Sequence, residues 1–107
     1  MTLYHSNGNL AWRSEDERAI HYNGVTAYLD NIARHINGQT AYINGVAYHS
    51  NGKTAYINGI SYSEDGKILH SNGYGIKLEL GPNIEILVAE DLFEVIILKE
   101  VVKSNCW

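Results

Sequence analysis

The sequence reads TAYINGVAYHSNG over residues 40–52 and KTAYINGISY over residues 53–62, so one phrase returns after 14 residues. Its Asn-Gly pairs are typical of two-residue type I′ turns, because both central positions of that turn need positive φ. Each turn pair follows the last by seven residues, at Asn23-Gly24, Asp30-Asn31, Asn37-Gly38, Asn44-Gly45, Asn51-Gly52, Asn58-Gly59, Asp65-Gly66 and Asn72-Gly73. Five strand residues and two turn residues therefore make one unit, and two units make a hairpin.

This regular spacing predicts a mainly β fold. Asn7-Gly8 belongs to the same series, although the spacing to Asn23 is 16 because residues 14–17 replace a two-residue turn. We expect a repeat domain over residues 1–80, built as an antiparallel meander of about eleven short strands joined by two-residue Asn-Gly turns. The alternative is a two-sided β-solenoid in which 14-residue units stack in parallel. Tight turns favour the meander, since they join strands that pair as neighbours.

The hairpins are similar to those of one known repeat family. Residues 48–52 show the pattern Tyr-x-x-Asn-Gly. This pattern resembles MORN-type repeats, which are stacked hairpins with Tyr and Gly at fixed places. The resemblance covers residues 4–80 and concerns architecture only, so it implies a row of hairpins and carries over no functional residue.

Alternation along the strands sorts the repeat residues into rows. One face is expected to hold a row of large residues alternating with small ones, namely Ala19, Tyr28, Ala33, Tyr42, Ala47 and Tyr56. The same face is expected to hold a row of histidines alternating with threonines, namely His21, Thr26, His35, Thr40, His49 and Thr54. The other face should pair Leu29 with Ile32, Ile43 with Val46 and Ile57 with Ile60.

A ribbon of this kind buries little apolar surface alone, and residues 81–107 are the candidate cover. Gly81-Pro82-Asn83 ends the repeats, and residues 84–89 have the composition of a buried strand. Asp91 as an N-cap with Glu94 at N3 predicts a helix of about twelve residues to Lys103. The many Val and Ile residues leave a strand open as the alternative. We expect this segment to pack on the repeats or to form a homo-oligomer interface.

The chain totals exclude several classes of protein. The net charge of the 107 residues is −4 and no run of basic residues occurs, which argues against duplex nucleic acid as a partner. Cys106 is the single cysteine, so no intrachain disulfide forms and a reducing compartment is expected. The N-terminus lacks signal-peptide features and the apolar runs are short, so we expect a cytoplasmic protein without a membrane partner.

Catalytic and metal chemistry are poorly supported by the repeat. In a meander, His21, His35 and His49 lie two strands apart, about 9.5 Å between backbones, which is too far for ligands that share one zinc. Ser50 and Ser71 follow His49 and His70 directly, but neighbouring strand residues point to opposite faces. We therefore expect no metal, no other cofactor and no enzymatic activity.

Binding is better supported, because aromatic side chains beside His and Thr suit planar bases and sugar rings. Arg34 is a candidate for holding a phosphate or a carboxylate. We expect a non-catalytic protein that sequesters a small polar or nucleotide-like ligand, by analogy with small phage proteins that act as sponges for immune signals. The alternatives are a structural or protein-interaction module and a carbohydrate-binding repeat protein. The candidate ligand-binding residues are His21, His35, His49, Tyr28, Tyr42, Tyr56, Thr40, Thr54 and Arg34.

Overall fold

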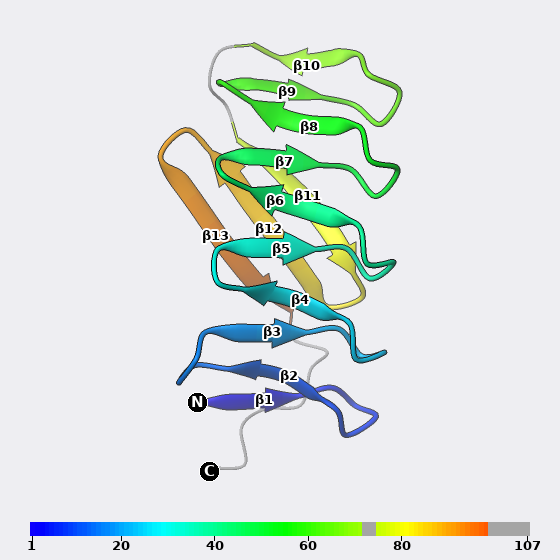
Figure 1. Cartoon of the computed structure of the whole chain (residues 1–107), viewed down its shortest axis with the longest axis vertical. Coiled ribbons are helices and arrows are strands. Elements are labelled where there is room, and N and C mark those ends of the chain that lie inside the picture. The colour runs from blue at the N-terminus through cyan, green and yellow to red at the C-terminus, as the bar shows by residue number, and fades with distance from the viewer. Residues whose placement is uncertain (72–74, 99–107) are drawn as a thin grey trace.

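The computed structural model describes residues 1–71 and 75–98, which form two antiparallel β-sheets and no helix (Figure 1). The first, which we call the repeat sheet, holds β1 (Thr2–Tyr4), β2 (Leu10–Arg13), β3 (Arg18–Ile20), β4 (Thr26–Leu29), β5 (Ile32–Arg34), β6 (Thr40–Ile43), β7 (Val46–Tyr48), β8 (Thr54–Ile57), β9 (Ile60–Tyr62) and β10 (Ile68–His70). The second, the tail sheet, holds β11 (Ile76–Gly81), β12 (Ile84–Ala89) and β13 (Leu92–Ile97).

The predicted antiparallel meander is confirmed. Strands β1 to β10 pair with their neighbours in chain order, so successive 14-residue units do not stack in parallel as a solenoid would require. The meander holds ten strands instead of the expected eleven, because β11 joins the tail sheet. The predicted turn at Asn72-Gly73 lies outside the described residues.

The turns of the repeat sheet are of two kinds, where the sequence predicted one. At Asp30-Asn31, Asn44-Gly45 and Asn58-Gly59 both residues have positive φ, which confirms two-residue type I′ turns there. The prediction is wrong at the alternate border, where only the glycine has positive φ and three residues lie between the two hydrogen-bonded residues that close the loop. In one such loop the Gly38 amide donates to the His35 carbonyl at 2.9 Å, as in a type I turn followed by a left-handed glycine. We call these the wide loops; they span residues 5–9, 21–25, 35–39, 49–53 and 63–67.

A β-bulge accompanies each wide loop. Between β5 and β6, Ala33 lies opposite Tyr42 and Arg34 lies opposite Thr40, which leaves Ala41 without a residue opposite. Ala11, Ala27 and Ala55 hold the same place in their hairpins, and all four alanines are fully buried. An extra residue in one strand bends the ribbon and increases its twist. The 14-residue repeat is therefore a repeat of bulged hairpins.

The bulge explains which of the predicted cross-strand rows of residues are confirmed. At the tight turns, Tyr42 lies opposite both Ala33 and Ala47, and Ile43 lies opposite Val46, as predicted. The row of histidines and threonines is wrong, because the bulge shifts the register by one residue near each wide loop. The threonines Thr26, Thr40 and Thr54 lie opposite Ile20, Arg34 and Tyr48.

The tail forms a hairpin of strands, not a strand and a helix. The predicted buried strand over residues 84–89 is confirmed as β12. The predicted helix from Asp91 is wrong, because β13 pairs with β12 without a break from Ala89 and Leu92 to Ile84 and Ile97. Alternate residues of β13 reach the core, and β-branched residues favour strands when such a partner is present. Residues 99–103 of the predicted helix lie outside the described residues, as does Cys106.

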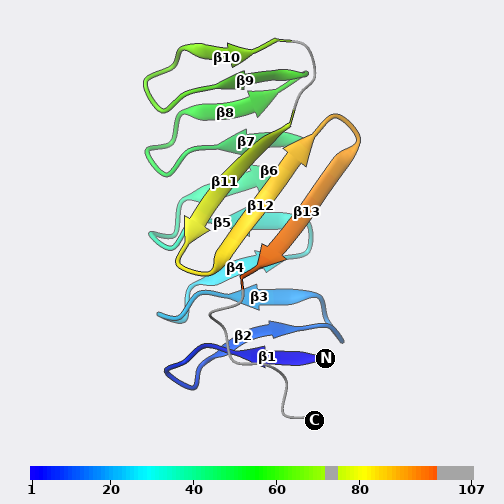
Figure 2. The ribbon, with the colours of Figure 1, turned by 180° about the vertical axis from the view of Figure 1, so that it is seen from behind.

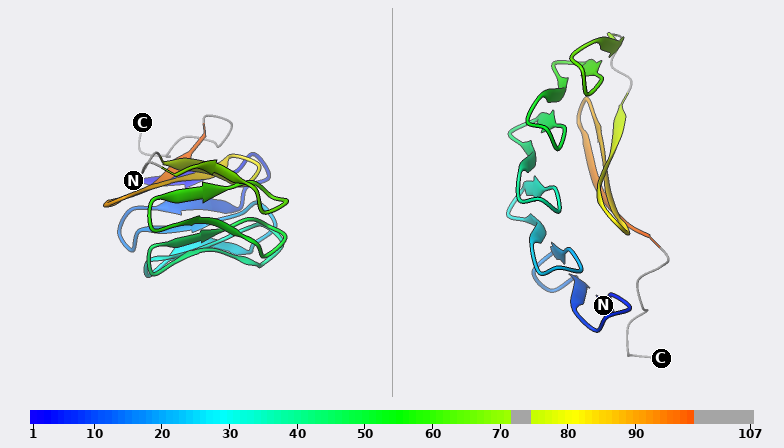
Figure 3. Two further views of the ribbon diagram at one scale, coloured as in Figure 1. Left: turned by 90° about the horizontal axis from the view of Figure 1, so that it is seen from above. Right: turned by 90° about the vertical axis from the view of Figure 1, so that its right-hand side faces the viewer.

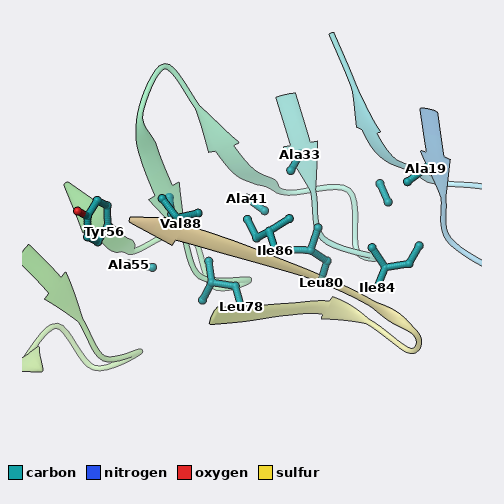
Figure 4. Packing of buried hydrophobic residues seen from close by; sticks show 12 residues of the cluster. Ala19, Ala33, Ala41, Ala55, Tyr56, Leu78, Leu80, Ile84, Ile86 and Val88 are labelled. Atoms are coloured by element: carbon teal, nitrogen blue, oxygen red, sulfur yellow. The ribbon is translucent and has the colours of Figure 1, made fainter. Parts of the chain in front are cut away.

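The tail sheet covers the concave side of the repeat sheet. Its strands cross the repeat strands obliquely (Figure 2), and the repeat sheet curves around them in side view (Figure 3). The buried face of β12 presents Ile84, Ile86 and Val88, and these large side chains pack with the small alanines of the repeat sheet (Figure 4). The Ile36 amide also donates to the Leu80 carbonyl at 2.8 Å, which joins the sheets through the backbone.

Within residues 1–71 and 75–98, no helix is present that is long and apolar enough to cross a bilayer.

Candidate functional site

The repeat histidines bind the backbone of the next hairpin. The Nε2 atom of His35 lies 2.7 Å from the Tyr48 carbonyl oxygen, and because a carbonyl only accepts, Nε2 carries the proton. His5, His21 and His49 repeat this contact with residues 20, 34 and 62. All four rings are buried. The histidines of the candidate binding set are thus engaged within the fold and do not face one common ligand.

The wide-loop asparagines add a second contact between hairpins. Asn37 accepts a hydrogen bond from the Gln39 amide within its own loop and donates to the Ser50 carbonyl of the next loop, at 2.9 and 3.1 Å. Asn7, Asn23 and Asn51 form the same pair of contacts. In the fifth loop Ser63 and Asp65 hydrogen-bond each other instead. No further wide loop follows among the described residues, so this change of residues coincides with the end of the repeat.

Burial lowers the pKa of His21 and His35 below the ordinary value of 6.5. It outweighs the hydrogen bonds to the Arg34 and Tyr48 carbonyls, which raise the pKa by favouring the protonated ring. The unfolded chain therefore takes up protons at a higher pH than the folded one. The contribution of the neutral His21 and His35 rings to the free energy of unfolding is fully present above about pH 6.5. It is lost as the pH falls through the pKa values of the folded state.

We expect the midpoint of thermal unfolding to fall as the pH is lowered from about 7 to about 5. The His35→Phe variant should show a smaller decrease over this range, because it has lost one of the two rings. Asp16, whose pKa is lowered by its hydrogen bond to Arg13, contributes only at lower pH, below about 4. Calorimetric scans over this pH range test the prediction, and an unfolding midpoint that rises on acidification contradicts it.

The remaining polar candidates do not form a joint site. Thr40 and Thr54 are half-buried in different hairpins, and Arg34 is exposed. Thr54 lines a separate open hollow with Lys53 and Tyr62. Within the described part of the chain, no three His, Cys, Asp or Glu side chains gather as a metal site needs.

A pocket of about 640 Å³ is lined by residues of two tight turns of the repeat sheet and of the turn that joins β12 to β13. We call it the aromatic pocket. Two residues of the candidate set, Tyr42 and Tyr56, line it together with Phe93 of β13. Its other polar lining residues are Asn58, Glu90 and Asp91. Two segments far apart in the sequence thus form one cavity.

Phe93 forms an aromatic wall with two repeat tyrosines. Its ring centroid lies 4.1 Å from that of Tyr42, with an interplanar angle of 22°, and 5.5 Å from that of Tyr28. On the Tyr28 side is a smaller pocket of about 200 Å³, which Trp12 and Glu17 also line. Stacked and tilted aromatic pairs of this kind are stabilising beyond the area that they bury. Phe93 therefore fixes the wall between the two pockets.

The pocket residues that the sequence-based prediction missed are Asn58 at a tight turn and Glu90, Asp91 and Phe93 in the tail. Asp91 and Phe93 were assigned to the start of a helix, and none of the four was considered as a pocket residue. The available signal was the alternation of Phe93, Val95 and Ile97, which places these three side chains on one face of a strand. Tyr28, Tyr42 and Tyr56 lie on one row of the repeat sheet, as predicted, and their role in ligand binding stays a prediction.

Tyr56 carries a buried hydroxyl group that has no hydrogen-bond partner among the described residues. Its side chain is 3% exposed. Because an unpaired buried polar group costs free energy, we expect Tyr56→Phe to raise the free energy of unfolding by about 1 kcal/mol. The matched control is Tyr28→Phe, which removes a hydroxyl that donates to Asn31 at 3.2 Å and should not stabilise. Urea unfolding of both variants tests this; equal losses of stability would contradict it.

The comparisons with known proteins gave no match, whether with family models, curated proteins or solved structures. The resemblance to MORN-type repeats therefore stays a prediction, and the argument for function rests on the pocket.

Proposed function

We propose that the protein is a non-catalytic binding protein that takes up a small ring-bearing molecule in the aromatic pocket. The observation that carries the proposal is the stacked wall of Phe93 and Tyr42 beside an open pocket of about 640 Å³. Pockets for small molecules are commonly of about 300–1,000 Å³ and combine aromatic side chains with polar groups that orient the ligand. Asn58, Glu90 and Asp91 are the polar groups here.

The lining favours binding over catalysis. Tyrosine and phenylalanine offer ring faces and edges, and Asn58 offers an amide, all of which contact a ligand without reacting with it. Nucleophilic catalysis requires a serine, cysteine, threonine or lysine beside a base. The repeat histidines provide neither a nucleophile nor a base to the pocket, because they bind carbonyl groups of the repeat.

A thermal-shift panel of indoles, nucleosides and monosaccharides tests the proposal. A ligand at about 100 times its Kd stabilises the folded state by about 2.7 kcal/mol, so at least one ring-bearing class should raise the unfolding midpoint. Phe93→Leu should abolish this rise, because it removes the wall but keeps an apolar side chain. Tyr22→Leu is the matched control, since Tyr22 is 45% exposed on a wide loop and does not line the pocket. The proposal fails if no ring-bearing compound shifts the midpoint, or if Phe93→Leu responds as the wild type does.

A second candidate function, association between copies of the chain, is favoured by one edge of the repeat sheet. The edge strand β10 exposes Ile68 and Leu69, whose exposed fractions are 61% and 51%. Exposed apolar edge strands tend to pair with another chain. Native mass spectrometry should then show oligomers that the double variant Ile68→Lys, Leu69→Lys dissociates and that Tyr22→Lys leaves intact. A monomeric wild-type protein at micromolar concentration would exclude this function.

A further inference from the structure

The charges at the aromatic pocket point to the class of its ligand. We propose that the pocket selects an organic cation that carries a flat ring, such as a protonated arylalkylamine, over neutral and anionic molecules of the same shape. This inference rests on the proposed function, because it concerns the same pocket.

The charges that line the pocket are all of one sign. Glu90 and Asp91 are its only charged lining residues among those the structure describes; both are exposed and belong to the turn between β12 and β13. Two negative charges at the mouth of a pocket raise the local concentration of ligands of the opposite sign. A primary ammonium group satisfies these carboxylates both by charge and by its three donors.

Aromatic side chains form the other part of the lining. Tyr42, Tyr56 and Phe93 supply ring surfaces to one cavity. Aromatic rings attract cations through their quadrupole, and they pack against a second flat ring by stacking or edge contacts. A molecule that joins a flat ring to an ammonium group therefore matches both halves of the lining.

The hydroxyl of Tyr56 is a further polar group beside the pocket. This side chain lines the pocket and is almost completely buried, yet its oxygen has no partner among the described residues. Buried polar groups are nearly always hydrogen-bonded, either to the protein or to ordered water. A water molecule that enters the pocket with a polar ligand is the kind of partner that this hydroxyl lacks.

The same lining disfavours a ligand that carries a phosphate group. Arg34, the candidate anion-binding residue, is exposed and does not line the aromatic pocket. A nucleotide would place its negative charge beside Glu90 and Asp91, where like charges repel. The ligand class is thereby narrowed from nucleotide-like molecules in general to cationic ring compounds.

Isothermal titration with three indoles of similar shape tests the inference. Tryptamine is a cation, tryptophol is neutral and indole-3-acetate is an anion at neutral pH. We expect tryptamine to bind about tenfold more tightly than tryptophol, and indole-3-acetate to bind most weakly. Added salt should weaken tryptamine binding more than tryptophol binding.

The double variant Glu90→Gln, Asp91→Asn should remove the preference for tryptamine and preserve the affinity for tryptophol. Asn tolerates the positive φ of 62° at position 91, so the turn is expected to persist. The matched control is Glu94→Gln, which removes an exposed carboxylate of β13 that does not line the pocket and should keep the preference.

The outcomes separate the inference from the proposed function. Equal or tighter binding of tryptophol or indole-3-acetate overturns the cation selectivity and leaves the pocket as a binding site. An unchanged preference in the double variant likewise overturns the role of the two carboxylates. If no indole binds and the thermal-shift panel is also silent, both the inference and the proposed function fail.

Discussion

Replacing Phe93 with alanine is expected to lower the free energy of unfolding by about 3 kcal/mol, the scale of a Phe→Ala truncation in a packed site. The ring lies against Tyr28 and Tyr42 and packs on the core formed by both sheets. Its removal takes away the side chain that lines both pockets and deletes the only aromatic side chain of β13. Urea unfolding followed by tyrosine and tryptophan fluorescence measures the loss.

Two further substitutions separate the contribution of the Phe93 ring to stability from that of strand β13. Phe93→Leu should cost about 1 kcal/mol, because leucine retains most of the apolar volume. Leu92→Ala should cost less than the alanine change at Phe93, since Leu92 is 42% exposed. A Phe93→Ala protein as stable as Leu92→Ala would contradict the packing of the tail sheet on the repeat sheet.

His35→Ala is expected to cost about 3 kcal/mol, the second large effect. The ring is 3% exposed, and its Nε2 donates to the Tyr48 carbonyl at 2.7 Å. The alanine variant loses this hydrogen bond and also leaves a cavity, and the two losses add. Because the contact joins successive hairpins, the loss should appear in the cooperative unfolding of the whole repeat sheet.

A second substitution at position 35 separates the free-energy cost of the lost hydrogen bond from that of the cavity. His35→Phe preserves the ring volume and removes the donor, so it should cost about 1–3 kcal/mol at about pH 7.5. His49→Phe, which removes the equivalent bond to Tyr62, is the matched repeat of the experiment. If both phenylalanine variants are as stable as wild type, the histidines do not stabilise the repeat in the way described.

Most of the repeat sheet could be predicted because its information is local. An Asn-Gly pair specifies a reversal of the chain, and the seven-residue spacing specifies strand length. Asn-Gly fits both a type I′ turn and a type I turn with a left-handed glycine, so the pair alone did not separate tight turns from wide loops. The distinguishing residue is two positions before the asparagine: His35 begins the wide loop that holds Asn37, whereas Tyr42 precedes the tight turn at Asn44.

The tail could not be predicted from local pattern alone. Asp91 and Glu94 fit a helix start, and the apolar residues around them fit a buried helix. The pairing of β13 with β12 decides the outcome, because it satisfies the backbone and places Phe93 on the core face. The aromatic pocket exists only once this hairpin has packed against the tight turns, which explains why its acidic residues were missed.

The central claim is that the aromatic pocket binds a cationic ring compound, and titrating tryptamine into the ¹⁵N-labelled protein while recording amide chemical shifts tests it most directly. The predicted result is saturable shifts concentrated at Tyr42, at the turn glycines Gly45 and Gly59, and at residues 90–93. Saturable shifts confined to the wide loops or to the surroundings of Arg34, or no shifts at all, would contradict the claim.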